Sequence, residues 1–235
     1  MSIEHAYDAL AQKWDTLYTT QREQAEDALV VGYLRRKGYL QGNILEVASG
    51  TGLLLDYAKD AIRPGVYLGV DVSRVMVAEA RRKHPGYTFH RGDMRQLPCP
   101  DNSVDVLLCV FCGFSYMLDE MQAEGAVGEF FRVLKPGGKV LVMAYGPETF
   151  RAHAYEVVEA GRVLPRRQYA PDTLGKLFSR VFLDAKVWGL SSSRFHRLSL
   201  RWPKWVFRWW LRGEALLTRR WWRSSCRFLV VEGVK

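Results

Sequence analysis

The chain has little cysteine and no long apolar run. Its four cysteines among 235 residues are too few and too scattered for a disulfide scaffold. Cys109 and Cys112 form a C-x-x-C pair, but neither a second pair nor a histidine cluster completes four zinc ligands, so we expect buried thiols and no metal. No apolar run approaches the roughly 18 residues that span a bilayer. No charged-then-apolar signal opens the chain, so we expect a cytoplasmic protein.

Internal repeats and low-complexity tracts are missing as well, which argues against a solenoid or a disordered chain. The hydrophobic content of 48% is ordinary for a folded protein. A length of 235 residues is enough for one α/β domain with a good core. We expect a single domain over residues 1–235.

The most informative stretch is a short apolar run that opens into a turn with two glycines. Residues 44–47 predict a buried strand, residues 48–52 a tight turn, and residues 53–59 a helix. Such a junction is typical of a nucleotide site, although a bare structural turn has the same pattern. The turn lacks the three-glycine spacing of dinucleotide-binding enzymes, so a dehydrogenase is the weaker hypothesis.

Acidic residues mark the ends of two further predicted strands. Asp71 lies in the run 68–72, about 20 residues beyond the glycine turn, where nucleotide folds place a carboxylate on ribose hydroxyls. Asp93 follows the run 87–91, and a fourth strand is predicted at 104–110. Each acid alone has a common role as a helix cap or turn former. At successive strand ends they favour a nucleotide site.

Four blocks of the sequence carry a family resemblance: residues 44–52, Asp71, residues 92–105 and residues 129–138. With these blocks the chain resembles the class I S-adenosylmethionine-dependent methyltransferases, most closely the ubiquinone and menaquinone biosynthesis branch, over residues 5–146. The resemblance implies a Rossmann-like α/β fold whose seven-stranded, mostly parallel sheet has an antiparallel last strand and helices on both faces. It also implies S-adenosyl-L-methionine as the cofactor.

The resemblance further implies a role for each matching residue. Asp71 would hold the ribose, Asp93 would accept from the adenine amino group, and Val72 would pack on the adenine face. The Met94 amide would donate to the adenine ring, and Glu46 would help to anchor the methionine ammonium. The remaining implied cofactor residues are Tyr7, Trp14, Ala48, Gly50, Gly52, Val110 and Phe111.

Some of these positions depart from the family's usual residue or have an alternative structural role. Ala48 stands where the family usually has its first glycine, and because its methyl group demands a negative φ, we expect a slightly different loop that still binds. Tyrosine is more usual where Trp14 stands. Val110 and Phe111 have plain core packing as an alternative role, since apolar residues at strand ends usually pack.

The second half of the chain is predicted to complete the sheet. Strands are expected at residues 139–145, 185–190 and 227–234, with helices near 148–160 and 171–182. In the family, the last two strands form an antiparallel hairpin.

The same comparison with the family suggests three elaborations of the domain. Residues 1–40 are expected to form a helical cofactor cover. Residues 146–168 and 194–226 are expected as insertions on the cofactor side of the sheet, because ligands bind beyond the carboxyl ends of parallel strands. The first insertion contains Arg166 and Arg167.

The excess positive charge of the chain lies in one segment. Residues 194–227 hold ten Lys and Arg against one acid and six of the eight tryptophans, whereas the rest of the chain is balanced. This composition predicts a basic amphipathic helix beside the substrate entrance. It could contact an anionic membrane at its inner face, form a plain lid, or bind nucleic acid.

We therefore expect a methyltransferase that acts on a small, hydrophobic or amphiphilic molecule, lipid-like or quinone-like. The candidate catalytic residues are Tyr116, His153 and His196, with Tyr145 as a further acceptor-side residue, because a hydroxyl or C–H acceptor needs proton removal. One alternative is an RNA or DNA methyltransferase that uses the basic segment, although the Asn/Asp-Pro-Pro-Tyr motif of base-amine methyltransferases is absent. The other alternative is a non-catalytic cofactor-binding scaffold.

Overall fold

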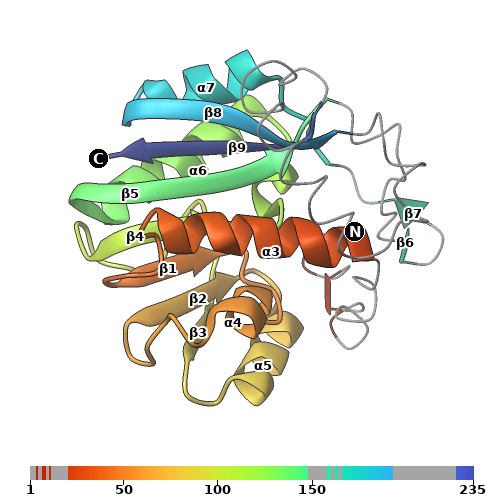
Figure 1. Ribbon diagram of the computed structural model, residues 1–235, viewed down its shortest axis with the longest axis vertical. Coiled ribbons are helices and arrows are strands. Elements are labelled where there is room, and N and C mark those ends of the chain that lie inside the picture. Colours follow the sequence, from red (N-terminus) through yellow and green to blue (C-terminus); the bar gives the residue numbers. More distant parts are fainter. Residues whose placement is uncertain are drawn as a thin grey trace.

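The computed structural model describes residues 4, 7, 8, 11, 21–147, 158–159, 162–163, 166–192 and 226–235. Within these residues the helices and strands alternate along most of the chain (Figure 1). The helical elements are α3 (Gln21–Arg36), α4 (Leu53–Ala58), α5 (Arg74–Lys83), the 3-10 helix η1 (Gly113–Tyr116), α6 (Glu120–Val133) and α7 (Pro171–Ser179). The strands are β1 (Ile44–Val47), β2 (Tyr67–Asp71), β3 (Thr88–Arg91), β4 (Val104–Cys109), β5 (Leu134–Tyr145), β6 (Val158–Glu159), β7 (Arg162–Val163), β8 (Leu183–Ser192) and β9 (Cys226–Val234).

Seven of these strands form one sheet in the order β3-β2-β1-β4-β5-β9-β8. Strands β1 to β5 pair in parallel, and β9 runs antiparallel to both of its neighbours. The predicted fold class, a mostly parallel sheet with an antiparallel last strand, is confirmed.

Helices cover both faces of the sheet, as the sequence predicts. Buried residues of α6 and α7 pack on one face, and those of α3, α4 and α5 pack on the other. Arg227 on β9 pairs with Glu26 on α3 at 3.3 Å, and the Tyr33 hydroxyl of α3 donates to Glu232 of β9 at 2.6 Å. These contacts fix α3 against the sheet, because a buried charge is stable only when it is paired.

Two sequence-based boundaries are wrong. Strand β5 begins at Leu134, five residues before the predicted start, because Leu134 pairs with Val104 of β4 and the regular pairing resumes at Lys139 after a register shift. The helix expected near 148–160 does not include Val158 and Glu159, which pair with Arg162 and Val163 in a two-stranded ladder. Residues 148–157 and most of the predicted 194–226 insertion lie outside the described residues.

Candidate functional site

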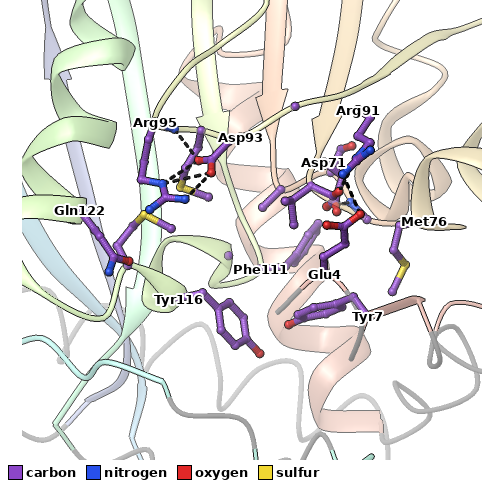
Figure 2. Close-up of a pocket in the computed structure, with 18 of the residues that line it drawn as sticks. Glu4, Tyr7, Asp71, Met76, Arg91, Asp93, Arg95, Phe111, Tyr116 and Gln122 are labelled. Atoms are coloured by element: carbon purple, nitrogen blue, oxygen red, sulfur yellow. Dashed lines mark hydrogen bonds and ion pairs between the residues drawn. The ribbon is translucent and has the colours of Figure 1, made fainter. Parts of the chain in front are cut away.

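A cavity of about 710 Å³ lies at the carboxyl ends of β1, β2, β3 and β4, a volume typical of small-molecule sites (Figure 2). Ligands bind at this edge of parallel sheets because the connecting loops and helix starts meet there. The lining residues are Glu4, Tyr7, Ala48, Ser49, Gly50, Leu53, Asp71, Val72, Met76, Arg91, Gly92, Asp93, Met94, Arg95, Phe111, Gly113, Tyr116, Met117 and Gln122.

The turn after β1 is held by the acid at the end of β2. The Gly50 N–H donates to Asp71 Oδ2 at 2.8 Å, and the Ser49 N–H donates to the Val70 carbonyl at 3.1 Å. The Ser73 N–H donates to Asp71 Oδ1 at 2.9 Å. Each carboxylate oxygen therefore keeps acceptor capacity for a ligand hydroxyl.

Burial shapes the titration of this carboxyl group. It raises the pKa of Asp71 above its usual range, although the N–H groups of Ser73 and Gly50 oppose the rise. A further hydrogen-bond donor would stabilise the ionised carboxylate, so two ribose hydroxyls are suitable ligands for it.

The expectation that Ala48 has a negative φ is wrong. Its φ is +54°, the left-handed region that disfavours a side chain. The hydrogen bonds of the next two residues, to Val70 and Asp71, hold the turn in this shape. Room for the methyl group exists because position 113 is glycine: a Cβ there would lie 2.3 Å from the Ala48 Cβ.

Asp93, at the end of β3, also has a partner within the protein. The Arg95 guanidinium contacts both Asp93 oxygens, at 2.5 to 3.1 Å (Figure 2). This arginine lowers the pKa of Asp93, which stays ionised near neutral pH. An amino group of a ligand could share this carboxylate with Arg95, because a carboxylate accepts several hydrogen bonds.

The described residues of the N-terminal segment contact the same edge of the sheet. Glu4 pairs with Arg91 at 2.8 Å, and Asp8 Oδ1 accepts from the Ser73 hydroxyl at 2.5 Å. The Tyr7 ring meets the Tyr116 ring edge-on, with centroids 5.4 Å apart. These contacts place Glu4 and Tyr7 in the lining of the cavity, and a cofactor cover over residues 1–40 stays a prediction.

The loop after β4 forms the opposite side of the cavity. Phe111 and Cys112 both have positive φ, at 58° and 67°, and such strained non-glycine residues cluster at functional sites. Phe111 and Tyr116 line the cavity. Burial raises the pKa of the Tyr116 hydroxyl, so it is neutral near pH 7 and can donate a hydrogen bond.

Three predicted cofactor residues do not line the cavity. Glu46 is 1% exposed and accepts a hydrogen bond from the Tyr67 hydroxyl, because side chains alternate along β1 and this one faces α4 and α5. Gly52 faces His84, which a Cβ at position 52 would approach at 2.7 Å. Val110 is buried in the core.

The remaining predictions divide between buried positions and residues that cannot be placed. Tyr145 is partly buried and does not line the cavity, and its hydroxyl accepts from Arg166. Cys109 and Cys112 are free and fully buried, so the expected core thiols are confirmed. Trp14, His153 and His196 lie outside the described residues.

Sequence reasoning missed about half of the lining residues. Leu53, Met76 and Met117 contribute apolar surface and sit at element ends whose orientation no local pattern specifies. Arg91 and Arg95 could have been predicted to line the cavity, because each lies within two residues of Asp93 in the sequence. Gly113 had none, since its role depends on Ala48, 65 positions earlier.

Comparison with known proteins agrees with this geometry. Residues 44–138 match the family described as "Methyltransferase domain". The chain is 43% identical over 103 residues to a demethylmenaquinone methyltransferase of Chlorobaculum parvum, which covers 43% of this chain and 40% of that one. It is 31% identical over 162 residues to a dTDP-3-amino-3,6-dideoxy-alpha-D-glucopyranose N,N-dimethyltransferase of Streptomyces fradiae, covering 68% of this chain and 60% of that one.

The fold has close counterparts among solved structures. One chain from the complex between the Haloferax volcanii Trm112 methyltransferase activator and a methyltransferase superposes with a TM-score of 0.70 at 22% identity, over 99% of this chain and 97% of that chain. At this identity the likeness shows the fold alone. The chain spans about two fifths to three fifths of the length of the two relatives above. It belongs to the class I S-adenosylmethionine-dependent methyltransferases, as the sequence motifs predict.

Proposed function

We propose that this protein transfers a methyl group from S-adenosylmethionine to a small, hydrophobic or amphiphilic acceptor. The observation that carries the proposal is the cofactor wall, which we define as Gly50, Asp71 and Asp93 at the ends of three adjacent strands. Asp71 supports the glycine turn and keeps acceptor capacity for ribose hydroxyls, and Asp93 keeps capacity for the adenine amino group.

The protein residues would align the two reactants and exclude water. When bound, the cofactor supplies a methyl group on a positively charged sulfur, so attack needs alignment more than further activation. Tyr7 and Glu4 would cover the cavity, and Phe111 and Met117 would offer apolar surface near the acceptor. The neutral Tyr116 hydroxyl would orient the acceptor by donating a hydrogen bond.

The acceptor class is the less determined half of the proposal. The two relatives named above act, by their names, on a menaquinone precursor and on a nucleotide-linked amino sugar. The apolar side chains of the cavity favour a hydrophobic or amphiphilic acceptor over a highly polar one. Contact of residues 194–227 with a membrane or nucleic acid stays a prediction. Among the described residues, no helix is both long and apolar enough to cross a bilayer.

One labelling experiment tests the proposal. Purified protein is incubated with methyl-labelled S-adenosylmethionine and a cell extract, and label is counted in the lipid-soluble, small polar and nucleic-acid fractions. We expect lipid-soluble label that depends on intact Asp71. Label in nucleic acid would instead support the RNA or DNA alternative. Cofactor binding without transfer to any fraction would support the scaffold alternative.

A further inference from the structure

Helix α5 begins beside the cavity, directly after the acid that is proposed to hold the ribose. Its first residue, Arg74, lies three positions after Asp71, and the Ser73 N–H donates to Asp71 Oδ1 at 2.9 Å. The first turn of α5 contains no acidic residue of its own. The free N–H groups at a helix start carry partial positive charge and need acceptors. The start of α5 therefore offers donors to a carboxylate from elsewhere in the chain.

Asp8, in the N-terminal segment, supplies that carboxylate. Asp8 Oδ1 accepts from the Ser73 hydroxyl at 2.5 Å and from the Val75 N–H at 3.2 Å. The Ser73 hydroxyl oxygen in turn accepts from the Met76 N–H at 3.0 Å. A serine side chain and a carboxylate 65 positions earlier in the sequence therefore share the donors at the start of α5.

Three residues of the N-terminal segment contact three different elements around the cavity. Glu4, Tyr7 and Asp8 are helical, and their spacing places them on one face of a helix. Glu4 pairs with Arg91 at the end of β3, and the Tyr7 ring meets the Tyr116 ring of η1 (Figure 2). Asp8 adds the contact with α5, so this face is held at β3, η1 and α5.

The contact of Asp8 should be stronger than the ion pair of Glu4. The Arg91 side chain is 56% exposed, so solvent screens its pair with Glu4. Asp8 instead joins a carboxylate to two donors at once, and one of them belongs to Ser73, which is fully buried. Charge-assisted hydrogen bonds of this kind are roughly twice as strong as those between neutral groups. Asp8 is therefore the residue whose loss should most loosen this segment.

The same contact links the N-terminal segment to the cofactor wall. Ser73 donates its N–H to Asp71 and its O–H to Asp8, so one residue joins the two carboxylates. Burial is the main cause of the raised pKa of Asp71, and the negative charge of Asp8 adds to the rise. Further donors to Asp71, such as ribose hydroxyls, would offset the repulsion between the two carboxylates. Cofactor binding and the Asp8 contact should therefore favour each other.

We propose that Asp8 is a positioning residue that holds the N-terminal segment against the cavity and thereby slows release of the cofactor. Asp8 does not line the cavity, so it acts through Ser73 and through its neighbour Tyr7, which does line it. The inference rests on the proposed function, since it concerns how the cofactor of that reaction is retained. Without the Asp8 contacts, Glu4 and Tyr7 lose their strongest anchor, and the cofactor should leave faster.

The release rate of S-adenosylhomocysteine tests this inference. Labelled S-adenosylhomocysteine is chased from the protein with an excess of unlabelled compound, and calorimetry gives the Kd. We expect Asp8→Ala to release it about tenfold faster and to bind it about tenfold more weakly, which corresponds to about 1.4 kcal/mol. Asp8→Asn keeps an oxygen that can accept from Ser73 and Val75, so its release rate should stay within about threefold of the wild type.

Two further variants separate this role from a general loss of stability. Asp172→Ala is the matched control, because it removes a carboxylate from the first turn of α7, which does not line the cavity, and it should leave release unchanged. Ser73→Ala removes the hydroxyl donor and should by itself speed release. Its effect and that of Asp8→Ala should be strongly non-additive, because both remove the same contact. Near-ultraviolet circular dichroism shows that each variant is folded.

Two results would overturn the inference: release from Asp8→Ala at the wild-type rate, or additive effects of Asp8→Ala and Ser73→Ala on release. If the wild type does not bind S-adenosylhomocysteine, the proposed function fails and the role of Asp8 fails with it. If the wild type binds it and Asp8→Ala releases it at an unchanged rate, only the role of Asp8 fails.

Discussion

The cofactor wall and the segment 166–168, which is bonded to η1, differ in how their polar groups are paired. On the cofactor wall, Asp71 accepts two backbone N–H groups and Asp93 pairs with Arg95, so each carboxylate is held in place by the protein. In the segment 166–168, which does not line the cavity, Arg166, Arg167 and Gln168 each have a buried donor that no described residue accepts.

This difference separates a surface open to a ligand from a segment packed behind it. A wall whose polar groups are already oriented binds its ligand with little rearrangement, because its geometry exists before binding. The unpartnered donors of residues 166–168 are sealed from the cavity, so a ligand there does not reach them as the structure stands.

The largest effect should come from breaking the cofactor wall at Asp71. Asp71→Ala removes the acceptor of two N–H groups and the proposed ribose contact. We expect S-adenosylhomocysteine to bind roughly 100-fold more weakly by calorimetry, about 3 kcal/mol. Asp60→Ala, at an exposed aspartate that pairs with Arg35, should leave affinity unchanged. A loss below about threefold at Asp71 would remove it from the cofactor wall.

The contact between Gly113 and Ala48 should give the next largest effect, because it joins the two sides of the cavity. Gly113→Ala places a Cβ 2.3 Å from the Ala48 Cβ, and we expect a loss of about 2 kcal/mol in the free energy of unfolding by urea. In an Ala48→Gly background the nearest atom is the Cα of residue 48 at 3.7 Å, so the same change should cost much less. Additive losses in this double-mutant cycle would contradict the contact.

Tyr116→Phe tests whether the side of the cavity formed by the loop after β4 can be changed without affecting the cofactor wall. We expect the turnover number to fall about tenfold, since a hydrogen bond to the acceptor is lost, while the Kd for S-adenosylhomocysteine stays within twofold. Burial raises the pKa of Tyr116, so the hydroxyl is not a base at neutral pH, and the pH profile of turnover should keep its shape. A lost ionisation in that profile would make Tyr116 a general base instead.

Glu46 lies in the core next to the cofactor wall, and its raised pKa predicts a pH-dependent stability. Burial raises its pKa to about 8 from the ordinary 4.5, so the folded protein holds a proton that the unfolded chain releases. The stability from this group is fully present below pH 4.5 and is lost as pH rises through 8. Across this window we expect the free energy of unfolding to fall by on the order of 1 kcal/mol per pH unit.

The matched variant for this pH dependence is Glu46→Gln, which can still accept from the Tyr67 hydroxyl. Urea unfolding at pH 5, 6, 7 and 8 should show a flatter dependence for the variant than for the wild type. Affinity for S-adenosylhomocysteine at pH 6 should stay within twofold, because Glu46 does not line the cavity. Parallel pH dependences for the two proteins would contradict the raised pKa.

The smallest effect should come from the ion pair between Glu4 and Arg91, which joins the cover to the cofactor wall. The Arg91 side chain is 56% exposed, and exposed pairs contribute about 0 to 1 kcal/mol. Glu4→Gln should weaken S-adenosylhomocysteine binding no more than about threefold, with the difference shrinking at high salt. A much larger loss would mean that the cover closes mainly through this pair.

The sequence determined the sheet and the cofactor wall well because both depend on local patterns. Apolar runs that end in an acid or a glycine turn predicted the strands near residues 44–47, 68–72 and 87–91, and parallel pairing then brought their carboxyl ends together. The positions of Gly50, Asp71 and Asp93 in the cavity followed from that rule alone.

Only the tertiary structure decided which neighbouring residues face the cavity. Glu46 turned away because the alternation along β1 directs it to Tyr67. Ala48 took a positive φ because the turn donates hydrogen bonds to β2, which hold it in shape, and Gly113 leaves room for the methyl group. Arg167 and Tyr169 came to lie beside η1 and β5 through backbone hydrogen bonds to residues 52 and 24 positions earlier. Contacts between residues so distant in the chain depend on the packing of whole elements, which no local periodicity encodes.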